Sequence, residues 1–99
     1  MKDILDIPIE VRADVERGID ILKEGGCREV YLFGSITDGR SGIMSDIDFA
    51  VRGCPERNFF KLQGRLLVEL NKSSDLIDLD ADPELAAFLE HEARLVHVG

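Results

Sequence analysis

Two aspartates, Asp46 and Asp48, are the residues of this chain whose type and spacing are best suited to chemistry. They open the segment 46–52, in which acidic and apolar residues alternate as they do along a β-strand. This alternation puts both carboxylates on one face of the strand, about 6.5–7 Å apart along the backbone. Magnesium takes one or two carboxylates and completes its shell with water and substrate phosphates, so the pair predicts a Mg²⁺ site.

The residues before this strand are polar and rich in glycine, and they begin with Gly34 and Ser35 directly after an apolar run at 29–33. A strand that ends at Gly-Ser and turns at once can present backbone N–H groups and a hydroxyl to an anion. Glycine at that turn allows a phosphate to come close to the backbone. The turn and the two aspartates together would hold a triphosphate and its metal ions in one place.

A purely structural interpretation makes Asp46 and Asp48 the solvated face of an edge strand. Two observations weigh against it. The other face of the same strand is fully apolar, and two carboxylates converging on one face repel each other and raise a pKa unless a cation neutralises them. A bound metal ion would remove that repulsion.

The elements that must position these residues alternate between helical and extended patterns. The chain has 99 residues, which fit one domain, 1–99. Periodicity predicts an α+β fold (mixed α/β), with a small mixed sheet covered by helices on at least one face. Phe59 and Phe60 are expected in its core. The expected helices are 8–23, 56–71 and 83–90, and the expected strands are 29–33, 46–52, 76–79 and 95–98.

Composition excludes several classes of protein. Twenty acidic residues against twelve basic ones give a formal charge of −8, which disfavours stable binding to bare nucleic acid or to an anionic membrane.

No apolar run is long enough to cross a membrane, and no signal peptide is recognisable, so a cytoplasmic location is expected. Cys27 and Cys54 are expected to be small, partly buried thiols, and His91 and His97 do not share a helical face as a zinc pair would.

The segment 34–51 resembles the signature of the DNA polymerase β-type nucleotidyltransferases, in particular the minimal nucleotidyltransferases encoded beside HEPN-domain partners. The likeness consists of Gly34-Ser35, a second glycine at Gly39, and Ser45 directly before Asp46-x-Asp48. It extends to the polymerase β-like fold and to nearly the whole chain. The resemblance implies two Mg²⁺ ions bridged by Asp46 and Asp48, with ATP as substrate.

Members of that family carry a third carboxylate on the next strand, for which Asp75, Asp78 and Asp80 are candidates here. The family's run of alternating valine, leucine and aspartate aligns with residues 74–79 and places the catalytic and metal-binding acid at Asp75. Strand parity favours Asp78 instead, because Ile77 and Leu79 would share the more apolar face of the strand. Both possibilities remain open at this stage.

The phosphate-binding residues implied by the resemblance are Gly34, Ser35, Arg40 and Ser45. The family often has a basic residue between the two glycines, whereas this chain has Thr37 and Asp38, an acid that repels a triphosphate. Arg40 is the candidate substitute for that basic residue.

The resemblance implies an antitoxin that transfers AMP from ATP to a hydroxyl of a HEPN-type ribonuclease toxin. About twenty residues follow Leu79, too few for a further core, so another chain is expected to complete the acceptor pocket. Three alternatives stay open: a non-catalytic module that acts by occlusion, a nucleotidyltransferase that modifies a small molecule such as an aminoglycoside, and a homodimer with a shared cleft.

Overall fold

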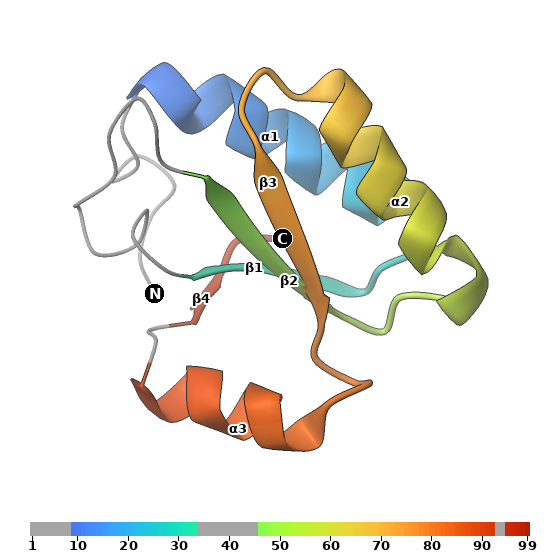
Figure 1. The fold of residues 1–99 in the computed structure, drawn as a ribbon, viewed down its shortest axis with the longest axis vertical. Coiled ribbons are helices and arrows are strands. Elements are labelled where there is room, and N and C mark those ends of the chain that lie inside the picture. The colour runs from blue at the N-terminus through green and yellow to red at the C-terminus, as the bar shows by residue number, and fades with distance from the viewer. Residues whose placement is uncertain (1–8, 34–45, 93–94) are drawn as a thin grey trace.

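A computed structural model describes residues 9–33, 46–92 and 95–99 of the chain. Within these ranges the chain forms three helices and four strands, which are labelled in Figure 1. In chain order they are α1 (Ile9–Glu24), β1 (Glu29–Phe33), β2 (Ile47–Arg52), α2 (Glu56–Glu69), β3 (Ser74–Asp78), α3 (Pro83–Glu92) and β4 (Val96–His97). All the expected elements are therefore present. The bounds differ by at most two residues: β3 begins two residues before the apolar run at 76–79, α2 ends two residues earlier than expected, and α3 ends two residues later.

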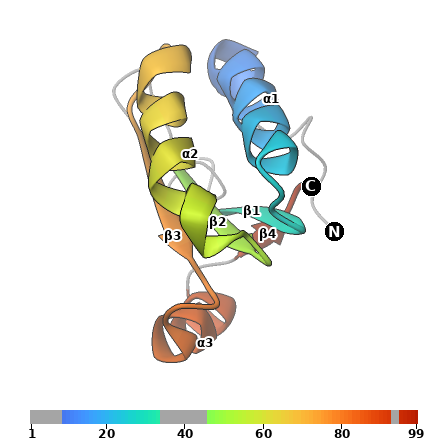
Figure 2. The same cartoon turned by 90° about the vertical axis from the view of Figure 1, so that its right-hand side faces the viewer.

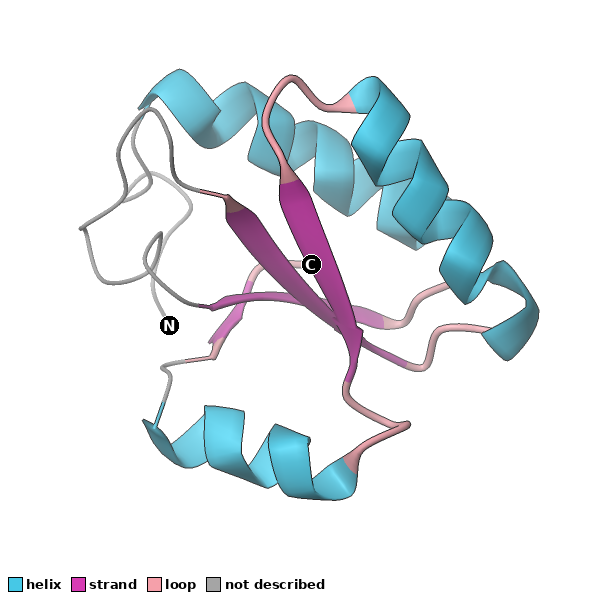
Figure 3. Ribbon diagram, in the orientation of Figure 1, coloured by secondary structure: helices cyan, strands magenta, loops and turns pink. Residues whose placement is uncertain are grey.

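The four strands form one mixed sheet in the order β3-β2-β1-β4. β1 is antiparallel to both β2 and β4, whereas β2 and β3 are parallel. A parallel pair needs a crossover between its strands, and α2 provides it. β2, which carries Asp48, consequently lies inside the sheet with a paired neighbour on each side (Figure 3).

Helices cover both faces of this sheet, as the side view in Figure 2 shows: α1 and α2 lie on one face and α3 on the other. Alternating residues of β2 divide between the two layers. Ile47, Phe49 and Val51 are fully buried in the core beneath α1 and α2, and Ala50 packs with Leu79 and the buried residues of α3. The expected separation of the two faces of β2 is confirmed.

Phe49 fixes β2 against α1 because α1 has a glycine at the point of contact. A Cβ atom at Gly18 would overlap the Phe49 ring, so only glycine lets the helix come this close to the strand. Burying a phenylalanine side chain contributes about 1.5–3 kcal/mol. The contact therefore holds in place the strand that carries Asp48.

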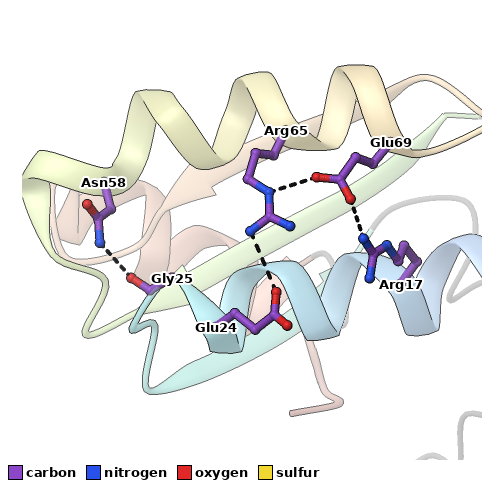
Figure 4. A network of polar contacts seen from close by, with 6 residues as sticks. All are labelled: Arg17, Glu24, Gly25, Asn58, Arg65 and Glu69. Carbon is purple, nitrogen blue, oxygen red and sulfur yellow. Dashed lines mark hydrogen bonds and ion pairs between the residues drawn. The ribbon is translucent and has the colours of Figure 1, made fainter.

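A polar network joins α1 to α2 across the outside of the molecule (Figure 4). Glu69 forms an ion pair with Arg17 of α1 and accepts a hydrogen bond of 2.7 Å from Arg65, which lies 3.6 Å from Glu24. These pairs are partly solvated, and such pairs contribute at most about 1 kcal/mol each. These ion pairs therefore contribute to the alignment of α1 with α2 and add little to the stability of the fold.

The outer side of α2 differs from the expectation that Phe59 and Phe60 both lie in the core. Phe59 packs against the core, but Phe60 is 81% exposed, and Leu67 and Val68 are exposed as well. The apolar residues of α2 therefore extend around the helix beyond the stripe that Leu62 and Leu66 bury. No helix within the described ranges is long and apolar enough to span a membrane.

Candidate functional site

Asp48 and Asp75 are brought side by side by the parallel pairing of β2 with β3. The register of that pairing makes the two residues direct Cα partners. Neighbouring strands lie about 4.7–4.9 Å apart, and paired residues project from the same face of a sheet. Two carboxylates from separate strands thus share one face, the one on which α3 lies.

Asp46 lies directly before β2 and is exposed, whereas Asp48 is half-buried within the strand. The two-residue spacing puts the Asp46 side chain on the same side of the strand as Asp48. Asp46, Asp48 and Asp75 are called the carboxylate cluster below.

The electrostatics of Asp48 reflect this arrangement. Its pKa is raised above the ordinary aspartate value of 3.8, first by burial and then by the negative charges of Asp75 and Asp46. Burial and like charges both disfavour the ionised form of a carboxyl group. The cluster therefore concentrates negative charge that a cation would relieve.

Asp78 and Asp80 lie elsewhere. Asp78 pairs with Val51, which faces the core beneath α1 and α2, and its charge acts on the buried thiol of Cys27. Asp80 lies beyond β3, where its Oδ2 accepts a hydrogen bond of 2.6 Å from the backbone N–H of Gly53. Both aspartates are therefore at the far end of β2 from Asp46.

Strand parity favoured Asp78 on the assumption that only one face of the strand is apolar, whereas β3 contacts an apolar layer on each side. Leu76 belongs to the core beneath α1 and α2, and Ile77 packs into the second core with α3. An apolar residue on one face of this strand is therefore no sign that the other face is polar.

The predicted phosphate-binding residues Gly34, Ser35, Arg40 and Ser45 lie outside the described residues, as do Thr37, Asp38 and Gly39. The described residues on either side of that segment are Phe33 and Asp46. Phe33 is the Cα partner of Asp48 on β1, and Asp46 precedes Asp48 by two residues. The two described residues that flank the segment therefore belong to the carboxylate cluster or pair with it.

Asp14 of α1 binds the turn before β3, and it was not predicted from the sequence as a residue of the site. It is 6% exposed and accepts hydrogen bonds from the backbone N–H groups of Asn71 (3.2 Å) and Lys72 (2.9 Å), and from the Asn71 amide (3.3 Å). These bonds anchor the turn that leads into β3 and hence to Asp75. The available signal was an acid three residues after Val11, on the buried stripe of the helix.

The remaining candidate ligands form no metal site. His97 stacks on Tyr31 with ring centroids 4.9 Å apart, while His91 lies on α3. Cys27 and Cys54 are free thiols that hydrogen-bond to each other, and burial raises the pKa of Cys27. Within residues 9–33, 46–92 and 95–99, no group of three His, Cys, Asp or Glu side chains is arranged to hold a metal ion, and this finding includes the three acids of the carboxylate cluster.

Comparison with known families assigns the chain to a family. A sequence profile described as "Polymerase beta, Nucleotidyltransferase" matches residues 16–97, which include every strand and the carboxylate cluster. The chain belongs to this polymerase beta nucleotidyltransferase family. In this family member, the matched segment runs from within α1 to β4.

Solved structures similar to this nucleotidyltransferase are toxin–antitoxin complexes. One was crystallised with AMP-PNP: it is 25% identical, has a TM-score of 0.64, and the match covers 84% of this chain and 69% of that one. A second, a mutant of the toxin–antitoxin MntA-HpeT, is 25% identical with a TM-score of 0.63 and coverage of 83% and 70%. A third, another MntA-HpeT mutant at 22% identity and a TM-score of 0.62, shares the fold over 81% of this chain and 69% of that one.

A sequence comparison with curated proteins finds no significant match. The family profile and the structural likeness therefore carry the assignment.

Proposed function

We propose that this protein is a Mg²⁺-dependent nucleotidyltransferase that transfers AMP from ATP to a hydroxyl group of a protein partner, a HEPN-type ribonuclease toxin. The observation that carries the proposal is the pairing of Asp48 with Asp75 on one face of the sheet, with Asp46 beside them. Because the chain belongs to the polymerase beta nucleotidyltransferase family, we assign these three acids to nucleotide transfer.

The carboxylate cluster fits a hard divalent cation. Its donors are carboxylate oxygens, and the pKa of Asp48 is raised by burial and then by the charges of Asp75 and Asp46, which a cation would offset. Mg²⁺ is bound through one or two carboxylates and completes its shell with water and substrate phosphates, so these acids suit it. When bound, two such ions would lower the pKa of the attacking hydroxyl and neutralise the leaving pyrophosphate.

Asp46 and Asp48 would hold both ions, and Asp75 would hold the one on the side of the attacking hydroxyl. The proposed transfer forms a bond between the acceptor oxygen and the α-phosphorus and breaks the bond from that phosphorus to the β-phosphate oxygen. The hydroxyl proton passes to Asp75, the exposed member of the pair, and pyrophosphate leaves. Gly34, Ser35, Arg40 and Ser45 are proposed to bind the phosphates.

The proposal of a protein acceptor is supported by the structural likeness. The solved structures that this chain resembles at 25% identity are toxin–antitoxin complexes, and one of them was obtained with AMP-PNP. The formal charge of −8 also favours association with a basic, RNA-cutting partner through long-range attraction.

The test mixes the purified protein, Mg²⁺-ATP and the co-encoded partner, and then measures the intact mass of the partner. We expect the partner to gain the mass of AMP with the wild type, and to gain none with Asp48→Asn or Asp75→Asn. Asp78→Asn is the matched control on the same strand, and it should retain the transfer.

A partner that is silenced without any gain in mass would reject AMP transfer and leave inhibition by occlusion. AMP transferred to an aminoglycoside but not to the partner would show a small-molecule enzyme instead. Equal transfer by the wild type and Asp48→Asn would reject the role of the carboxylate cluster.

A further inference from the structure

The outer face of α2 is apolar although nothing in the described part of the chain covers it. Phe60, Leu67 and Val68 are exposed by 81%, 64% and 84% of their surfaces. Residues separated by three, four or seven positions lie on one side of a helix, so these three side chains and Gly64 form one continuous stripe. This set of four residues is called the α2 stripe.

The stripe points away from the rest of the described molecule. Leu62 and Leu66 turn the opposite side of α2 to the core, and Arg65 and Glu69 turn a third side to α1 (Figure 4). Exposed large apolar groups that form a continuous patch mark an interaction surface more often than isolated ones do.

Gly64 lies in the middle of the stripe, and nothing within the described structure requires a glycine there. A Cβ atom at this position would meet no atom within 4 Å, whereas Gly18 and Gly25 each have a side chain packed against them. Glycine inside a helix costs about 0.5–1 kcal/mol relative to alanine. A glycine that costs stability without relieving a contact inside the chain fits the close approach of a helix from another chain.

The charges of α2 indicate which helix of another chain would pack against the α2 stripe. The N-terminal part of the exposed side carries Arg57 and Lys61, and Arg57 lies in the first turn next to Glu56, whose negative charge is the one that the helix dipole favours there. The last turn of the same helix has no basic residue to compensate its partial negative charge. Two antiparallel copies of α2 would place Arg57 of each copy beside the uncompensated C-terminal end of the other.

A two-fold axis at Gly64 also brings together two of the three apolar residues of the stripe. Phe60 and Val68 lie four residues before and after Gly64, so each would face the other across the axis. A two-fold interface needs a surface that is complementary to itself, and homodimer interfaces are more apolar than the average surface. We infer that the α2 stripe is a homodimer interface, in which two copies of this chain pack α2 against α2 in antiparallel orientation with Gly64 at the crossing.

This arrangement differs from a dimer with a shared cleft. The α2 stripe and the carboxylate cluster lie on opposite sides of the sheet, because the cluster faces the layer of α3 (Figure 2). The dimer would therefore leave both nucleotide sites open to a partner. The inference is independent of the nucleotidyl transfer proposed above.

Sedimentation equilibrium on the full chain tests the inference. The wild type is expected to show twice the 11.0 kDa mass of one chain at high concentration and to dissociate on dilution. Phe60→Glu should give only the single-chain mass. The matched control Phe88→Glu, at the exposed phenylalanine of α3, should associate like the wild type. A wild type that stays monomeric, or equal association of the two variants, would overturn the inference.

Cross-linking tests the position of the axis. Under mild oxidation, Gly64→Cys should form a covalent dimer, because the two introduced thiols meet at the crossing. The control Ala87→Cys, at an exposed position of α3, should form no more covalent dimer than the wild type, which retains Cys27 and Cys54. Equal cross-linking at positions 64 and 87 would reject an axis at Gly64.

Discussion

Asp48 combines a place inside the sheet with a charge that the fold does not neutralise. Its pKa is raised in the folded protein by burial and by Asp75 and Asp46, so the folded state binds a proton more readily than the unfolded state does. Between 3.8 and the raised value, stability therefore falls as pH rises, and the ionised carboxylate weakens the fold at neutral pH. An aspartate in a salt bridge has the opposite pH dependence, since its pKa is lowered and its ionised form stabilises the fold. The pH dependence expected for Asp48 is that of a carboxylate whose charge a bound cation would neutralise.

We accordingly predict that Asp48→Asn raises the Tm of the metal-free protein at neutral pH. Each kcal/mol gained would appear as about 4–8 °C in a domain of this size. The difference from the wild type should disappear below pH 3.8, where the carboxyl is protonated in both states. Mg²⁺ should raise the Tm of the wild type and not of the variant. Thermal unfolding by circular dichroism with and without Mg²⁺ measures both effects, and a lower neutral-pH Tm in Asp48→Asn would contradict the prediction.

Asp14 shows how a buried acid can be structural, since its partners are backbone N–H groups and not other acids. Removing it with Asp14→Ala leaves the N–H groups of Asn71 and Lys72 without this acceptor, which is expected to lower the free energy of unfolding by roughly 1–3 kcal/mol. Asp20→Ala, at an exposed aspartate of the same helix, is the control and should change stability little. Urea unfolding measures both, and equal effects of the two changes would refute the anchoring role.

At the scale of elements, the two helical glycines Gly18 and Gly64 differ in their surroundings: Gly18 is packed against Phe49, whereas Gly64 faces open space. Gly18→Ala places a methyl group on the ring of Phe49 and should destabilise the protein by about 1–3 kcal/mol. Gly64→Ala enters open space on α2 and should stabilise the single chain by about 0.5–1 kcal/mol. Chemical unfolding at protein concentrations low enough to keep the chain monomeric compares the two. Shifts of the same sign would show that local helix propensity alone decides both positions.

The elements themselves could be predicted from local patterns. The apolar run at β1 and the alternation along β2 gave the correct strands, because each pattern depends only on neighbouring residues. The exposure of Phe60 was missed because helical periodicity shows that residues share a face without showing how much of that face the sheet covers. Strand pairing is non-local, and this is why the sequence left Asp75 and Asp78 as alternatives.

At the scale of the whole molecule, sheet order brings the carboxylate cluster together. Asp48 and Asp75 are 27 positions apart in the sequence and become neighbours only because α2 carries the chain across to a parallel strand. The helices then cover both faces of the sheet, and its charged residues lie near the beginnings and ends of strands. The candidate site therefore depends on the order of the strands in the sheet. Only Asp46 and Asp48 could be predicted from a local sequence motif.

The central claim is that Asp75, and not Asp78, completes one cation and nucleotide site with Asp46 and Asp48. Calorimetric titration of ATP into the protein, with and without Mg²⁺, tests it most directly. We predict Mg²⁺-dependent ATP binding by the wild type and by Asp78→Asn, and its loss in Asp75→Asn while the fold remains intact by circular dichroism. Binding that survives in Asp75→Asn, or that disappears in Asp78→Asn, would contradict the account.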